Sequence, residues 1–102
     1  MQIKHIANAI EATKVCGEFY DELKRAQAKF PMWPEDVIHG VAIMAEESGE
    51  AVQAAIDYQY GDASRPDRWR LENLREELLQ TGAMALRMIL YIDRCIESMS
   101  RQ

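Results

Sequence analysis

The sequence has few cysteines and no excess of positive charge. Each of these two absences excludes a class of protein. Its two cysteines, Cys16 and Cys95, have no CxxC or Cys/His spacing, which predicts reduced thiols rather than a disulfide or a zinc site. The formal net charge is -5. An acidic chain lacks the Lys and Arg that neutralise the phosphates of a duplex, so no nucleic-acid partner is expected.

Long apolar runs and alternating strand patterns are missing as well. No apolar run is longer than five residues, as at residues 88–92, which is far short of a membrane span, and no segment near the amino terminus has the pattern of a signal peptide. No run of β-branched residues alternates with polar ones, so strands are not expected. We therefore expect a soluble, cytoplasmic, all-α protein with no membrane partner. Its 102 residues show no linker or repeat and predict one domain over residues 1–102.

Three segments with a helical spacing of apolar residues fill the chain. The first is expected at about residues 3–29 and ends before two prolines, because proline disfavours helical geometry in the residue before it. The second is expected from Pro34–Asp36 to about Tyr60, since proline and acidic residues suit a first turn. The third is expected at about residues 66–98. The predicted architecture is an antiparallel bundle of three long helices.

Apolar residues are too numerous for a chain of this size to cover. They make up 48% of the sequence, and a short chain buries only a modest share of its surface. Residues 81–92 contain a single charged residue, Arg87, and have apolar groups on every side, which is typical of a helix that is buried all round. We therefore expect a homo-oligomer, either a dimer or a tetramer, with the third helix at its centre.

Acidic residues on two different helices predict a metal site. Glu47 and Glu50 are three residues apart and therefore neighbours on a helix surface, and Glu77 and Gln80 repeat this spacing. Antiparallel packing of the two helices brings three carboxylates and an amide oxygen together, a set that suits Mg²⁺, or Mn²⁺ in its place, better than zinc. Glu47 lies in a mostly apolar strip, where an unpaired carboxylate is costly. The alternative is a solvated acidic face or an ion pair with Arg75 or Arg87.

The amino-acid sequence around these acidic residues resembles that of the MazG-like nucleotide pyrophosphohydrolases. AEESGEAVQAAID is similar to the second helix of that family, LENLREELLQTGAMALR is similar to the third helix of its small, often phage-borne members, and the likeness covers residues 33–91. The resemblance implies a MazG-like helical fold and Mg²⁺-dependent hydrolysis of (d)NTPs between the α and β phosphates, which yields the monophosphate and pyrophosphate. The metal ligands that it implies are Glu47, Glu50, Glu77 and Gln80.

The position of Gln80 is commonly Asp in the family that the chain resembles. Gln offers one neutral oxygen, so the site has one negative charge less and a weaker expected affinity for the metal. This difference keeps an alternative open, in which the protein is a catalytically weak or inactive helical oligomer that binds nucleotide or a protein partner.

Candidate residues exist for the other parts of the reaction. We expect Glu46, beside the metal ligands, to orient and deprotonate the attacking water, a role that Glu50 could also fill. Arg87 is the best candidate for phosphate binding, because Arg pairs with phosphate in a bidentate way; its alternative role is an ion pair at a subunit interface. Trp33 is expected to border the base and His39 the pocket mouth, although both residue types are more often structural.

Overall fold

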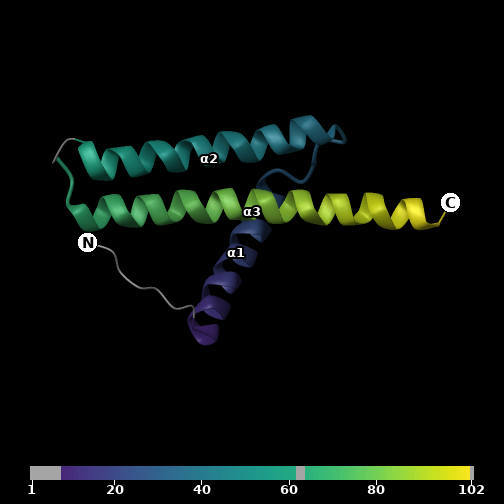
Figure 1. The fold of residues 1–102 in the computed structure, drawn as a ribbon, viewed down its shortest axis with the longest axis horizontal. Coiled ribbons are helices and arrows are strands. Elements are labelled where there is room, and N and C mark those ends of the chain that lie inside the picture. The colour runs from purple at the N-terminus through teal and green to yellow at the C-terminus, as the bar shows by residue number, and fades with distance from the viewer. Residues whose placement is uncertain (1–7, 62–63, 102) are drawn as a thin grey trace.

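Three helices and no strand form the part of the chain that the computed structural model describes, residues 8–61 and 64–101 (Figure 1). Helix α1 spans Ala9–Lys29, α2 spans Val37–Tyr60 and α3 spans Asp67–Ser100. The all-α fold that the sequence predicts is confirmed for these residues. None of the three helices combines the length and the apolar character that crossing a membrane requires.

Helices α1 and α2 begin where a side chain caps them, which corrects two predicted starts. The backbone of Asn8 is extended, and its side-chain oxygen accepts hydrogen bonds from the N–H groups two and three residues later. The prediction of one helix running from residue 3 is therefore wrong at Asn8, and residues 1–7 lie outside the described residues. Asp36 caps α2 in the same way, so both it and Pro34 precede the first turn instead of lying in it.

Helices α2 and α3 lie side by side and run in opposite directions, whereas α1 crosses α3 steeply (Figure 1). The antiparallel packing expected of the second and third helices is confirmed. The first helix departs from the predicted bundle, because it packs across α3 and not lengthwise along the other two. The result is a long helical hairpin with a third helix across it.

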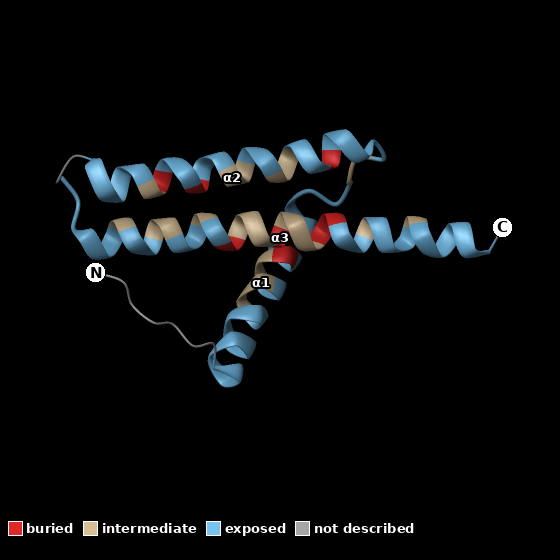
Figure 2. Ribbon diagram, viewed as in Figure 1, coloured by how far each residue is buried: buried red, intermediate tan, exposed pale blue. Residues whose placement is uncertain are grey.

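The core between the helices is thin and contains many small residues (Figure 2). A Cβ added to Gly40 of α2 would lie 2.7 Å from Sδ of Met88 of α3, so the two helices approach closely at this point. The buried apolar residues are Leu23, Ala51, Ala54, Leu79, Ala83 and Met88.

Two side chains of α3 hold the connection between α1 and α2. The guanidinium of Arg87, which is only 7% exposed, donates a 2.6 Å hydrogen bond to the carbonyl oxygen of Phe30. The hydroxyl of Tyr91 donates a 2.8 Å hydrogen bond to the carbonyl oxygen of Glu35. Trp33 lies between these anchors, with its ring centroid 4.8 Å from the guanidinium carbon of Arg87. This connection therefore has a fixed position against α3.

The crossing of α1 and α3 depends on a glycine. A Cβ built on Gly82 of α3 would overlap with the ring of Phe19 of α1, so the missing side chain makes the space that this ring occupies. Arg75 of α3 forms an ion pair with Glu18 beside the same contact. The close contact and the ion pair both hold α1 against α3.

Gly82→Ala should destabilise the protein by about 1–3 kcal/mol, because the added methyl group displaces the Phe19 ring at the crossing. The matched control is Gly17→Ala in α1, where an added Cβ meets nothing within 4 Å. This control should gain about 0.5–1 kcal/mol from helix propensity alone. Urea unfolding followed by circular dichroism measures both. Equal stabilisation by the two substitutions would contradict the close contact.

Candidate metal centre

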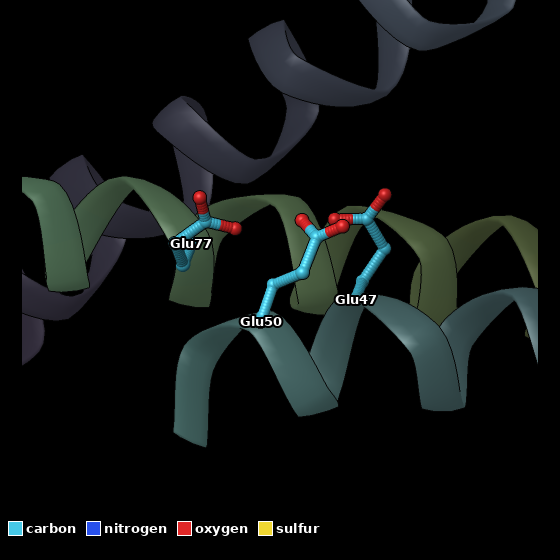
Figure 3. A group of neighbouring side chains, drawn as sticks. All are labelled: Glu47, Glu50 and Glu77. Carbon is cyan, nitrogen blue, oxygen red and sulfur yellow. The ribbon is translucent and has the colours of Figure 1, made fainter. Parts of the chain in front are cut away.

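Glu47, Glu50 and Glu77 converge between α2 and α3 (Figure 3). Each offers one carboxylate oxygen, and the three oxygens lie within 4.8 Å of one another. Glu47 and Glu50 share a face of α2 because they are three residues apart. Glu77 reaches them because α3 runs antiparallel to α2. The structure brings together the three residues that the spacing pointed to, and their role as metal ligands stays a prediction.

Two of the three carboxylates are held in an unfavourable environment. Burial raises the pKa of Glu47, and the nearby charges of Glu50 and Glu77 raise it further. Burial also raises the pKa of Glu77, followed by the charge of Glu50. The Oε2 atoms of Glu47 and Glu77 are buried and accept no hydrogen bond from the described residues. The ionised forms of these side chains therefore lack compensation within the described part of the chain.

The arginines that the sequence offered as ion-pair partners are engaged elsewhere. Arg75 pairs with Glu18 of α1, and Arg87 donates hydrogen bonds to carbonyl oxygens of the connection before α2. Within residues 8–61 and 64–101, no ion pair involves the three convergent glutamates. A hard divalent cation fits this arrangement, because it takes oxygen ligands and would compensate the buried, unpaired oxygens.

A cavity of about 400 Å³ opens beside the carboxylates and contains Gln80. Gln80 shares this cavity with Glu47, as expected for a residue three positions after Glu77. Glu22 of α1 lines it too, with a side chain that is 13% exposed, and its charge contributes to the raised pKa of Glu47. The sequence analysis missed Glu22. The sequence carried no signal for it, because only the steep crossing of α1 brings this residue to the site.

A second cavity, of about 310 Å³, lies next to the first and is mostly apolar. Trp33 and Arg87 line this second cavity. Four residues line both cavities, which are therefore adjacent, and we call the pair of cavities the trough; the shared residues are Ala26, Phe30, Ile43 and Met84. The trough therefore has acidic residues at one end and an aromatic ring with a buried guanidinium at the other.

Two predicted site residues lie apart from the convergent carboxylates. Glu46 is exposed on α2 and is not one of the three residues whose oxygens converge. His39 is exposed in the first turn of α2, eight residues before Glu47 and so about 12 Å away along the helix. The structure thus places Trp33 and Arg87 in the trough, and it leaves His39 at a distance from the acidic end.

Glu47→Gln should stabilise the metal-free protein at pH 7. The pKa of Glu47 is raised in the folded state above its ordinary value of 4.5, so the stability associated with this carboxyl falls as the pH rises above 4.5. A neutral amide removes this loss. The gain over the wild type should shrink toward pH 4.5, where the carboxyl becomes protonated in both states. Thermal unfolding in a chelator between pH 4.5 and 8 measures the effect.

The matched control for this variant is Glu46→Gln, which removes the neighbouring exposed charge. Its stability should stay within about 0.5 kcal/mol of the wild type at every pH, as is usual for surface substitutions. Addition of Mg²⁺ should raise the unfolding temperature of the control and not that of Glu47→Gln. A metal-free Glu47→Gln protein that is less stable than the wild type at pH 7 would show that the buried carboxylate has a compensating partner.

No family model, no curated protein and no solved structure matches this chain. A function therefore has to be inferred from the site itself. Its chemistry consists of three convergent carboxylates, two of which bury an unpaired oxygen, and a trough that leads from them to an aromatic side chain.

Proposed function

We propose that the protein is a Mg²⁺-dependent pyrophosphohydrolase that cleaves nucleoside triphosphates between the α and β phosphates. The observation that carries this proposal is the convergence of Glu47, Glu50 and Glu77, with buried and unpaired oxygens on the first and last of them. Such carboxylates destabilise the fold unless a cation or a proton compensates them. The likeness of both acidic segments to the MazG-like family supports Mg²⁺ as the cation and the triphosphate as the substrate.

The shape of the trough supports a nucleotide as the ligand. A nucleoside triphosphate joins a highly charged chain to a flat, weakly polar base, and the trough joins an acidic, cation-binding end to an apolar end. Trp33 at the apolar end is the proposed wall for the base. Arg87 lies beside it, ten residues and about 15 Å along α3 from Glu77. Its proposed role is therefore to hold Trp33 and contact the nucleoside, in place of the phosphate contact expected from the sequence.

The side chains of the acidic end have separate proposed tasks. Glu47, Glu50 and Glu77 would hold Mg²⁺, and Gln80, which lines the cavity beside Glu47, would add a neutral oxygen. When bound, Mg²⁺ supplies charge stabilisation at the α-phosphate. Glu46 is the proposed base that orients and deprotonates water, because it adjoins Glu47 and faces the solvent from which water enters.

Incubation with a panel of canonical and modified (d)NTPs and Mg²⁺ should release monophosphate and pyrophosphate. Glu50→Ala should lower this release roughly a hundredfold or more, because loss of a metal ligand removes several kcal/mol of charge stabilisation. Chromatography of the products measures the position of cleavage. Gln80→Asp should have equal or higher activity, since it restores a carboxylate to the cavity. Release by the wild type no greater than that by Glu50→Ala would favour the alternative of a non-catalytic oligomer that binds nucleotide.

We also propose that the working unit is a homo-oligomer. One chain exposes 8226 Å², whereas a compact monomer of this mass exposes roughly 5,900 Å². Its radius of gyration is 16.6 Å, against about 13 Å for a compact chain of 100 residues. The excess is roughly 2,300 Å² per chain, or roughly 4,600 Å² for two chains, which lies within the range that obligate dimers bury. The carboxyl-terminal half of α3 supports this assembly with large exposed apolar residues: Ile89, Leu90, Ile92, Ile96 and Met99.

Sedimentation velocity should show the wild type as a dimer or a tetramer, and Ile89→Glu should shift it to a smaller species. Ile89 is 55% exposed in one chain, and a charge at this position is costly if a second copy covers it. Ser98→Glu adds the same charge at an exposed polar position of α3 and should leave the assembly unchanged. A monomeric wild type at tens of micromolar, or equal dissociation of both variants, would argue against this surface as the interface.

A further inference from the structure

We infer that Arg25 and Lys29 of α1 bind the phosphate chain of the substrate. Both line the cavity of about 400 Å³ that also contains Glu47 and Gln80. They are four residues apart, so they lie on one face of α1. The inference rests on the proposed function, because it assigns the part of the trough that recognises the triphosphate.

The charge of the acidic end requires such residues. Three carboxylates and one divalent cation leave a net negative charge, which repels a triphosphate. Fixed cations near the phosphate oxygens offset this repulsion and form charge-assisted hydrogen bonds. Among the residues that line this cavity, the cationic ones are Arg25 and Lys29. Helix α1 thus supplies positive charge to a cavity whose neighbouring carboxylates, on α2 and α3, are negatively charged.

The spacing of the two cations matches a chain of phosphates. Four residues of helix separate them by about 6 Å along the axis. Arg25 forms an ion pair with Glu22, which lines the same cavity and whose charge contributes to the raised pKa of Glu47. The ammonium of Lys29 lies 5.4 Å from the ring centroid of Phe30, a residue that also lines the apolar cavity. When the base lies at the apolar end, the phosphate nearest the nucleoside therefore lies beside Lys29 and the outer phosphates lie beside Arg25.

Other cations near the trough are engaged in different contacts. Arg87 donates to the carbonyl oxygen of Phe30, and Arg75 pairs with Glu18. Lys24 lies next to Arg25 in the sequence, but it contacts Asp21 and the ring of Tyr20 and does not line this cavity. Lys24 is therefore a matched control that has the same helix and the same charge as Lys29.

Calorimetric titration with inorganic tripolyphosphate in the presence of Mg²⁺ tests the inference without a base or a hydrolytic readout. Arg25→Gln and Lys29→Gln should each weaken binding roughly tenfold, as expected for the loss of a charge-assisted hydrogen bond. Lys24→Gln should change the affinity less than about twofold, because surface charges are screened by salt. Circular dichroism confirms that each variant is folded.

A further control separates phosphate binding from the ion pair of α1. Glu22→Gln breaks the pair with Arg25 but keeps the cation, so it should bind tripolyphosphate as well as the wild type or better. Three results would overturn the inference. The first is a wild type that does not bind tripolyphosphate. The second is binding weakened equally by Glu22→Gln and Arg25→Gln, and the third is a Lys24→Gln variant that loses as much affinity as Lys29→Gln. Tight, cation-dependent binding without hydrolysis of any NTP would preserve the inference and refute the proposed hydrolase.

Discussion

The close antiparallel packing of α2 and α3 is the constraint on which the site depends. Small residues at the contact, among them Gly40, Ala51 and Ala83, let the two helices approach closely. This approach places Glu47 and Glu77 where water has little access and where each raises the cost of ionising the other. A wider spacing of the helices would solvate both carboxylates and remove the reason for a cation to bind between them.

The same packing limits the apolar area that one chain buries on its own. Small residues bury little apolar area, and hydrophobic stabilisation follows the area removed from water. Among the residues that the structure describes, no large side chain is fully buried, while many large apolar side chains remain exposed. The acidic end reduces stability further. A bound cation and a second copy of the chain would offset these two costs by separate means, one at the site and the other on the surface of α3.

Helix α1 supplies the positively charged residues of the site. Its crossing over α3, at Gly82, turns Glu22, Arg25 and Lys29 toward the cavity beside the carboxylates. The hydrogen bonds from Arg87 and Tyr91 fix the connection that follows, and with it the position of Trp33. The trough is thus assembled from all three helices, with the acids from the hairpin and the cations from the helix that crosses it.

The sequence by itself determined the helical elements and the convergence of the acids. Helical periodicity and proline breaks located the three helices to within a few residues, except at the start of the first. The three-residue spacing of Glu47 and Glu50, repeated at Glu77 and Gln80, depends only on local helix geometry and on antiparallel order. The helix geometry and the antiparallel order can both be inferred from the sequence alone.

Only the tertiary structure decided how α1 lies and what it contributes. Its angle to α3 depends on the fit of one ring, Phe19, against one backbone position, and no periodicity encodes such a contact. The place of Glu22, Arg25 and Lys29 at the site follows from that angle. Local spacing fixes which residues share a helix face, whereas the packing of side chains between helices fixes which faces meet.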